Sequence, residues 1–369
     1  MDATASSDEI KAFALKKGDV IITKDSEDPS DIGIPSLVIN DMPGVVCGYH
    51  LTIIRSSDFD TARILHRIFE SHPTKAHFFI EAPGITRYGL GQDAIGNVPI
   101  NLPPSEARKS IADRIEREVI RIDALISKKT RFLEILKEKR QTLITHAITK
   151  GTDPNTPMKD SDNTWTSKVP QHWKSIKFCR IARVTEGLVD PRNEPYCSMV
   201  LIAPNHIESS TGKLINLETA LQQNAESGKY ICRKGNVIYS KIRPALAKVT
   251  IAPCDGLCSA DMYPLECTNL ATEKWLYYLM LSKPFTAWAI LESDRVAMPK
   301  INRESLSELQ VLLPPKVEQI QIAEYIDAAI PRIDALATKT QRSIELLKER
   351  RSAFITAAVT GQIDIRNAL

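Results

Sequence analysis

The stretch LPPSEARKSIADRIEREVIRIDALISKKTRFLEILKEKRQTLITHAITK occupies residues 102–150, and LPPKVEQIQIAEYIDAAIPRIDALATKTQRSIELLKERRSAFITAAVTG occupies residues 313–361. A constant offset of 211 aligns them without a gap, and 22 of the 49 aligned positions are identical. Both contain the pentapeptide RIDAL, at residues 121–125 and 332–336. Agreement of this extent indicates an internal duplication, so the fold is best predicted from the duplicated segment.

Each copy has the periodicity of a long amphipathic helix, because apolar residues recur at spacings of three and four. The second copy contains Pro331, and proline costs about 3 kcal/mol inside a helix but little at its first position. We therefore predict a short helix over about 316–329, a long helix from Pro331, and a matching bend near Ile120. Each long helix would then have about 29 residues and a length near 45 Å.

Two similar helices in one chain pack most simply on each other. About 150 residues separate them, so a short hairpin is excluded and we predict a long-range antiparallel coiled coil. The residues predicted for its core are Ile122, Leu125, Leu136, Ile333, Leu336 and Leu347.

The segments outside the helices have a mixed pattern that is also duplicated. LKKGDVIITKD at residues 15–25 matches CRKGNVIYSKI at 232–242, and both are typical of a strand that follows a turn. The run WLYYLMLSKPFTAWAI from Trp275 predicts a buried helix. The first copy lacks the counterpart of roughly residues 165–232, so we predict that its domain is truncated at the N-terminal side.

The predicted fold class is therefore α+β, with two mixed α/β globular domains and two long helices that pair as an antiparallel coiled coil. The domains are expected over residues 1–101 (first globular domain, truncated), 102–158 (first helical region), 159–312 (second globular domain) and 313–369 (second helical region).

Composition and motifs exclude several classes of protein. The sequence contains no apolar run of membrane-spanning length, and no basic segment followed by an apolar core precedes the first domain. The seven cysteines are odd in number and scattered, which argues against a disulfide framework and indicates reduced thiols in the cytoplasm. Cys254, Cys258 and Cys267 lack a fourth ligand at zinc spacing. Walker A, HExxH and GxSxG motifs are absent from the sequence, so we expect recognition rather than catalysis.

The alternation of globular domain and repeated helix, with LPP at each junction, resembles the specificity (S) subunit of type I restriction–modification systems. The resemblance rests on the two repeats and on two further stretches, TRYGLGQDAIGNVPINLPP from Thr86 and KGNVIYSKIRPALAKV from Lys234. It covers nearly the whole chain from about residue 11.

The resemblance implies two target recognition domains, each reading one half of a split site in double-stranded DNA. It implies that the paired helices set the distance between the halves and dock two methyltransferase (M) subunits, with restriction (R) subunits as further partners. The chain itself would catalyse nothing and bind no metal or cofactor. S-adenosylmethionine, ATP and Mg²⁺ are expected on the partner subunits.

Proteins that read DNA place lysine and arginine against phosphates and guanine edges. The candidate DNA-contacting residues are Lys24, Thr86, Arg87, Lys241, Arg243, Lys248, Arg295 and Lys300, each with a solvated surface position as the alternative. The candidate contacts with partner subunits are Lys137, Glu138, Arg140, Lys348, Glu349 and Arg351, for which ordinary helix-face solubility is the alternative.

Two other functions stay open at the level of the sequence. The chain could be a silent or decayed specificity cassette, or a coiled-coil scaffold without DNA recognition. The short first domain has three explanations: a misassigned start codon, a decayed cassette, or a natural short form.

Overall fold

The computed structural model describes residues 4–161, 165–293 and 299–364, and the chain divides into two compact units. Unit 1 comprises Met1–Leu133 and Thr338–Leu369, and unit 2 comprises Glu134–Ala337. Each unit therefore contains one part of each long helix. Within the described ranges, no helix is long and apolar enough to cross a membrane.

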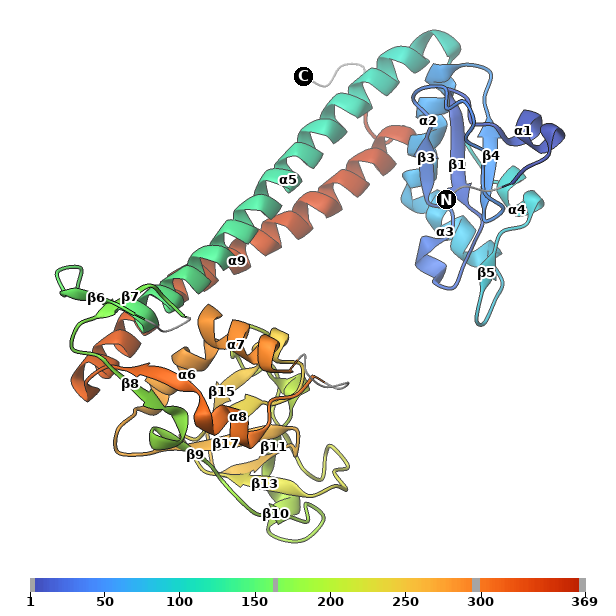
Figure 1. Ribbon diagram of the computed structural model, residues 1–369. Coiled ribbons are helices and arrows are strands. Elements are labelled where there is room, and N and C mark those ends of the chain that lie inside the picture. The colour runs from blue at the N-terminus through green and yellow to red at the C-terminus, as the bar shows by residue number, and fades with distance from the viewer. Residues whose placement is uncertain (1–3, 162–164, 294–298, 365–369) are drawn as a thin grey trace. The chain divides into compact units, whose positions relative to one another are not determined.

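Unit 1 is built on a three-stranded antiparallel sheet of order β3-β1-β4 (Figure 1). Alternate residues of its central strand, Val20 and Ile22, are fully buried. They pack in one core with Phe69 and with Ile115 and Ile355, which come from the two long helices. The elements are α1 (Ser7–Phe13), β1 (Asp19–Thr23), β2 (Asp25–Ser26), a 3-10 turn (Pro29–Asp31), β3 (Pro35–Leu37), β4 (Leu51–Arg55), α2 (Phe59–Glu70), α3 (His72–Glu81), β5 (Tyr88–Gly89), α4 (Gln92–Gly96) and the start of α5 (Ser105–Lys150).

Unit 2 contains the larger globular part, with a four-stranded sheet of order β15-β14-β17-β9 and a five-stranded sheet of order β10-β13-β16-β11-β12. Trp275 and Phe285 lie at the centre of its main core. The elements after α5 are β6 (Met158–Asp160), β7 (Lys168–Pro170), β8 (Lys174–Lys177), β9 (Ala182–Val184), β10 (Leu188–Val189), β11 (Val200–Ile202), β12 (Glu218–Thr219), β13 (Lys229–Cys232), β14 (Val237–Ser240), β15 (Val249–Ile251), β16 (Gly256–Cys258), β17 (Met262–Cys267), α6 (Glu273–Leu281), α7 (Lys283–Ser293), α8 (Arg303–Glu308), β18 (Gln310–Leu313) and α9 (Lys316–Val359), with 3-10 turns at Phe178–Arg180, Tyr196–Ser198, Pro204–His206 and Pro244–Leu246.

The duplication extends to details of the two globular parts. The strands β1, β3 and β4 correspond to β14, β15 and β17, since Val20 pairs with Leu37 and Ile54 as Val237 pairs with Ile251 and Leu265. The run from Trp275 forms two helices, α6 and α7, where the sequence predicted one. Proline is tolerated in the first turn of a helix but breaks a helix interior, and Pro284 lies in the first turn of α7 as Pro73 lies in the first turn of α3.

The two long helices are continuous, which corrects the prediction of a break at Pro331, and α5 runs without interruption through Ile120, where a bend was predicted. Helix α5 has 46 residues and α9 has 44, with Pro331 inside it. The missing backbone hydrogen bond at a helical proline costs about 3 kcal/mol. Ile326, Ile330 and Ile333 lie buried on either side of Pro331. Their packing offsets the loss and keeps the helix intact.

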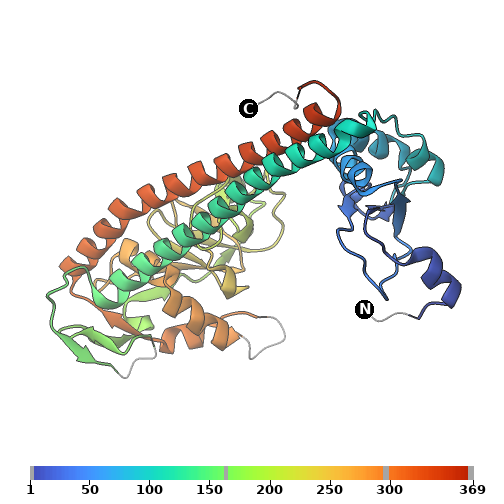
Figure 2. The same ribbon diagram turned by 90° about the horizontal axis from the view of Figure 1, so that it is seen from above.

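In each unit the parts of α5 and α9 lie side by side and antiparallel (Figures 1 and 2). In unit 1, Arg351 Nε donates to Asp123 Oδ1 at 2.8 Å. In unit 2, Arg140 Nε donates to Asp334 Oδ1 at 3.1 Å. Asp123 and Asp334 are the aspartates of the two RIDAL pentapeptides, and Arg140 and Arg351 are also related by the offset of 211. The duplicated sequence therefore makes the same contact twice.

The apolar contact between the helices is narrower than the sequence predicted. Ile122, Leu136 and Ile333 are buried and Leu347 is half-buried. Leu125 and Leu336 are 41% and 48% exposed, so their assignment to the core was wrong. A two-helix contact buries only a thin stripe, and a 3.6-residue helix drifts away from a strict heptad pattern. Side chains at the margin of that stripe therefore stay in solvent.

Arg140 offers a direct test of the contact between the helices. It is 9% exposed and also donates to the carbonyl oxygens of Ser210 and Thr211. We expect Arg140→Ala to destabilise unit 2 by about 2 kcal/mol, because a buried guanidinium that makes three hydrogen bonds is lost. All four tryptophans (Trp165, Trp173, Trp275 and Trp288) belong to unit 2, so urea unfolding followed by tryptophan fluorescence reports on that unit. Lys137→Ala, at an exposed position of the same helix, is the control; equal unfolding midpoints for the two variants would contradict the account.

Candidate nucleic-acid interface

The candidate DNA-contacting residues lie at the same place in each unit. In unit 2, the Ile301 amide donates to the Lys241 carbonyl at 2.8 Å, and in unit 1 the Leu90 amide donates to the Lys24 carbonyl at 2.7 Å. Lys24 and Lys241 are the first residues after β1 and β14. The end of the central strand and the segment before α4 or α8 thus form one surface in both units.

In unit 2 this surface gathers three of the predicted cations. Ile242 forms a β-bridge with Lys300, and the Arg243 amide donates to the Pro299 carbonyl at 3.2 Å. These backbone contacts bring Lys241, Arg243 and Lys300 together. Arg243 has a φ of +47°, a left-handed conformation that is costly for a residue with a side chain and that clusters at functional sites. Its side chain is exposed.

Arg303 and two tyrosines complete the surface, and sequence reasoning missed all three. The guanidinium of Arg303 lies 5.7 Å from the ring centroid of Tyr230 and 5.8 Å from that of Tyr263. Arg303 Nη2 also donates to the Tyr230 hydroxyl at 3.0 Å, and Lys241 Nζ lies 5.4 Å from the Tyr263 ring. Tyr263 and Arg303 come from β17 and α8, which are adjacent only in the folded chain. Cations held against aromatic rings suit contact with phosphates and bases.

The environment of Tyr263 keeps it un-ionised. Burial raises the pKa of its phenol above the usual value, and the nearby Arg303 offsets this only in part. The hydroxyl donates to the Ile301 carbonyl at 3.0 Å. The ring therefore stays neutral at physiological pH and adds no negative charge to a surface that would bind phosphate.

Of two further candidates in this unit, one makes a local structural contact and the other lies outside the described residues. Lys248 is half-buried and its Nζ donates to the Pro204 carbonyl at 2.6 Å, so the DNA contact predicted for it does not fit this structure. A lysine that satisfies a backbone carbonyl within its own unit is a local structural contact. Arg295 lies outside the described residues.

In unit 1 the equivalent surface has different chemistry. Arg87 Nη2 lies 2.7 Å from His50 Nδ1 and 3.5 Å from Asp25 Oδ2. His50 Nδ1 is 2.5 Å from Asp25 Oδ1, and the ring of Tyr49, which is 75% exposed, lies 3.7 Å from the imidazole. Thr86 is exposed in the neighbouring loop, and Lys24 is half-buried. Asp25 neutralises part of the positive charge here.

Position by position, the two surfaces share one cation and differ elsewhere. Lys24 corresponds to Lys241, but Ser26 stands where unit 2 has Arg243, and Gln92 stands where unit 2 has Arg303. Hydrogen-bonding side chains at these places determine which base edges can be recognised. The two surfaces therefore present different hydrogen-bonding groups.

Among the described residues, no group of three histidine, cysteine, aspartate or glutamate side chains is placed to hold a metal ion. Cys258 is buried, and burial raises the pKa of its thiol well above the usual value, whereas Cys254 is exposed. Of the three cysteines that the sequence singled out, Cys254 and Cys258 therefore have opposite environments.

The helix residues predicted to contact partner subunits divide into two groups. Lys137, Glu138, Lys348 and Glu349 are exposed. Arg140 and Arg351 are instead used within the chain, which corrects the prediction for these two. Arg351 is half-buried between Asp123 and Glu70. Burial disfavours its charge, but the two carboxylates outweigh burial and raise its pKa.

Comparison with known proteins places this arrangement in a family. The protein-family model named type I restriction modification DNA specificity domain matches residues 182–346. This range includes β14, β17, α8 and the start of the second helical repeat. This part of the chain belongs to the DNA specificity domain family of type I restriction–modification systems. It is 31% identical over 284 residues to the specificity subunit of the type I restriction enzyme EcoDI of Escherichia coli, covering 73% of this chain and 63% of that protein.

Other members of the family are more distant. The chain is 21% identical over 284 residues to the MjaVIII specificity subunit of Methanocaldococcus jannaschii, covering 73% of this chain and 63% of that protein. It thus spans about 63% of the length of these two curated specificity subunits. A solved structure from a study of complex assembly in a type I restriction–modification system has a TM-score of 0.71 at 17% identity, covering 95% of this chain and 83% of that chain, which shows a shared fold.

Proposed function

We propose that this chain is the DNA sequence-specificity subunit of a type I restriction–modification complex and recognises a bipartite DNA site without catalysing a reaction. One observation carries the proposal: the strands β3-β1-β4 and β15-β14-β17 repeat one arrangement. Each places a lysine, an arginine and an aromatic ring near the same end of its central strand, among otherwise different side chains. Two such surfaces would read two different half-sites. Helices α5 and α9, which contribute to both units, would fix the spacing between the half-sites.

We propose the long helices as the site where methyltransferase subunits dock. Apolar side chains stay exposed at equivalent positions of the two repeats: Leu125 and Leu336 at 41% and 48%, and Ile135 and Leu346 at 44% and 48%. Exposed apolar residues that recur along a helix, beside charged residues such as Lys137 and Glu138, are typical of a protein interface. The partner subunits would carry S-adenosylmethionine, ATP and Mg²⁺, and restriction subunits would join the same complex.

A scaffold without DNA recognition is less well supported. A scaffold would need the helix pair alone, whereas this chain also holds Lys241, Arg243 and Arg303 at one surface. Arg243 is kept there by a strained left-handed backbone. Strain of this kind persists where the surrounding structure enforces it, most often at functional sites.

Substitution of the basic surface in unit 2 tests DNA contact. We expect Lys241→Ala combined with Arg243→Ala to weaken binding of the assembled complex to DNA about tenfold or more, because two phosphate or base contacts are lost. The slope of log affinity against log salt should also become shallower by about one to two. Lys234→Ala, an exposed lysine at the other end of β14, is the control. Equal affinities for the two variants in fluorescence anisotropy titrations would contradict the assignment.

Charge placed in the exposed apolar positions of the helices tests partner docking. We expect Leu125→Asp combined with Leu336→Asp to reduce co-purification of the methyltransferase subunit at least tenfold, because a carboxylate would be buried without a partner. The exposure of both side chains predicts that the free chain stays folded, which its tryptophan fluorescence would report. Leu188→Asp, which changes an apolar residue of unit 2 that is 56% exposed, should leave association intact. Undiminished association of the double variant would show that the partner docks elsewhere.

A further inference from the structure

Arg140 of α5 is bonded to a loop of unit 2 as well as to the other long helix. Its Nε donates to Asp334, and its Nη1 and Nη2 donate to the carbonyl oxygens of Ser210 and Thr211 at 3.0 and 3.2 Å. All three guanidinium nitrogens are therefore engaged. Because the guanidinium is a rigid, planar fork, these bonds hold the loop at one place relative to the helix. We call residues 208–212 the linking loop.

The linking loop is packed tightly against the globular part of unit 2. Ser210 has a φ of +62° and Gly212 a φ of +72°, so both adopt the left-handed conformation. A Cβ at Gly212 would collide with the Tyr277 hydroxyl and lie 2.5 Å from the Val249 carbonyl oxygen. The same tyrosine hydroxyl donates to the Thr211 carbonyl at 2.9 Å. A loop held in this way transmits the position of its bonded neighbours instead of absorbing a shift.

The linking loop is bonded in turn to a segment at the candidate DNA surface. The Ser210 amide donates to the Leu246 carbonyl at 3.1 Å. Leu246 ends the 3-10 turn Pro244–Leu246, which directly follows Arg243. The carbonyl of Ser210 thus accepts from the helix, while its amide donates to this turn. We call residues 243–247 the Arg243 turn.

The Arg243 turn has a strained conformation that its surroundings must maintain. Arg243 and Ala247, at its two ends, have φ values of +47° and +43°, which cost free energy for residues with a side chain. Of the four non-glycine residues with positive φ in the described part of the chain, three lie in this turn or in the linking loop. Strain of this kind persists where neighbouring contacts enforce it. The Pro299 carbonyl holds one end of the turn at 3.2 Å, and Ser210 holds the other.

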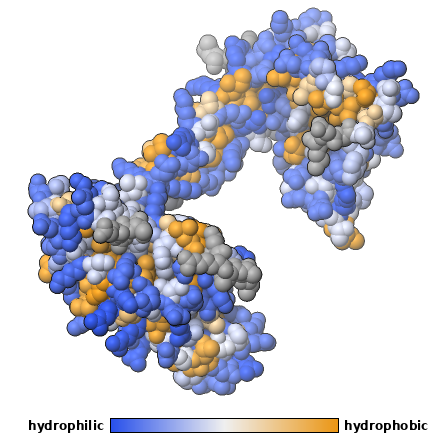
Figure 3. Space-filling view, in the orientation of Figure 1, coloured by the Kyte–Doolittle hydropathy of each residue, from blue (hydrophilic) through white to orange (hydrophobic). Residues whose placement is uncertain are grey.

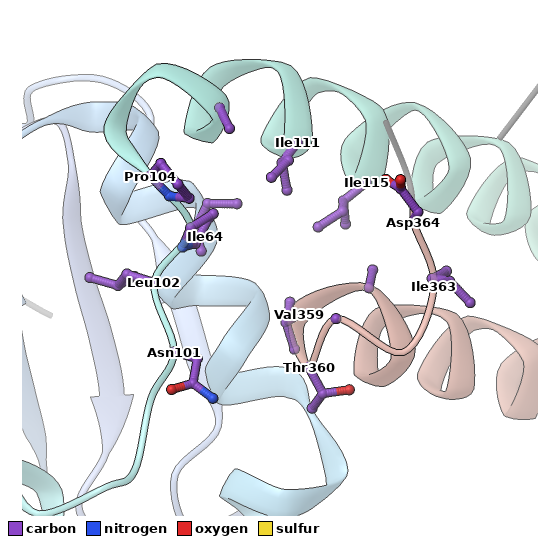
Figure 4. A pocket seen from close by; sticks show the side chains of 14 residues that line it. Ile64, Asn101, Leu102, Pro104, Ile111, Ile115, Val359, Thr360, Ile363 and Asp364 are labelled. Carbon is purple, nitrogen blue, oxygen red and sulfur yellow. The ribbon is translucent and has the colours of Figure 1, made fainter. Parts of the chain in front are cut away.

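Arg351, the counterpart of Arg140, is bonded differently in unit 1. Besides Asp123 it binds Glu70, at the end of α2. A pocket of about 340 Å³, lined mainly by apolar side chains, lies where α5 and α9 meet α2 (Figure 4). The described residues that line it include none of the candidate DNA-contacting residues. The printed ion pairs of Arg351 thus lead to α2, so this residue provides a matched control for Arg140.

We propose that Arg140 is a positioning residue for DNA reading: through Ser210 it fixes the Arg243 turn and thereby directs the Arg243 side chain at the DNA. The ion pair that joins the two helices would then also fix the reader of unit 2. This inference rests on the DNA recognition proposed above. It adds a residue that is itself buried away from the DNA surface and acts through backbone groups.

The helix pair is also the proposed docking site of the methyltransferase subunit. Figure 3 shows hydrophobic residues along these helices. Leu336, two positions after the Asp334 that pairs with Arg140, is 48% exposed. A partner seated there lies beside the Arg140 ion pair, so DNA reading is to be measured with the assembled complex of this chain and the methyltransferase subunit.

The informative quantity is base discrimination, the ratio of the affinity for the recognised duplex to the affinity for a duplex with one changed base pair. A wrong base pair commonly weakens specific binding about tenfold. Simple destabilisation lowers the folded fraction equally for every duplex, so it leaves this ratio unchanged. A displaced Arg243 turn lowers the ratio at the base pairs that Arg243 reads and leaves it unchanged elsewhere.

Fluorescence anisotropy titrations of single-substituted duplexes test the proposal. We expect Arg140→Gln to lower discrimination about threefold or more at the base pairs where Arg243→Gln lowers it, and to leave the other half-site unchanged. Arg140→Lys, which keeps a charged donor, should lower it less. Adding Arg140→Gln to Arg243→Gln should cause no further loss at these base pairs, because both residues act through one turn. Arg351→Gln should leave discrimination at these base pairs unchanged. Tryptophan fluorescence would verify that unit 2 is folded in each variant.

The role of Arg140 would be overturned by unchanged discrimination in either Arg140→Gln or Arg243→Gln, or by equal losses in both half-sites. Additive losses in the double variant, or the same loss in Arg351→Gln, would overturn it as well. Each of these results would leave DNA recognition by the chain standing. A complex with the unchanged chain that binds every duplex equally would instead overturn DNA recognition itself, and this inference with it.

Discussion

The two long helices are joined by one ion pair that the chain makes twice. In unit 1 the Asp123 carboxylate accepts a hydrogen bond from Arg351, and in unit 2 the Asp334 carboxylate accepts one from Arg140. Each repeat supplies one aspartate from its RIDAL pentapeptide and one arginine 17 residues later, so two antiparallel copies satisfy each other reciprocally, as in a self-complementary interface. The arginines are held further, Arg140 by two backbone carbonyls and Arg351 by Glu70. This reciprocity explains why the chain carries the same pentapeptide at two distant places.

The same duplication shapes the candidate DNA surfaces. A backbone hydrogen bond from Leu90 to Lys24 is repeated from Ile301 to Lys241, so the scaffold of the surface is kept. The side chains around it are not kept, since Arg243 and Arg303 have Ser26 and Gln92 as counterparts. A retained scaffold with varied side chains is what two readers of different sequences require.

The sequence predicted local elements better than long-range contacts. The two long helices followed from periodicity and from the offset of 211, and the strands after KKG and RKG followed from the match between residues 15–25 and 232–242. The break at Pro331 was wrong because propensity cannot weigh the packing of Ile330 and Ile333 against a lost hydrogen bond. Arg140 was predicted to be a surface residue because its contacts with Ser210 and Thr211 join segments about 70 positions apart. Arg303 and Tyr263 were missed for the same reason, since only the fold brings β17 and α8 together.

A map of methylated adenines tests the central claim most directly. It would be made in a host that carries this chain with its cognate methyltransferase subunit, for the unchanged chain and for chains with Arg87→Gln or Arg303→Gln. The account predicts a split motif with a fixed spacer. It also predicts that Arg87→Gln relaxes one half of the motif and Arg303→Gln relaxes the other, because each arginine belongs to a different reader. Identical effects of the two substitutions on both halves, or a map that does not depend on this chain, would contradict it.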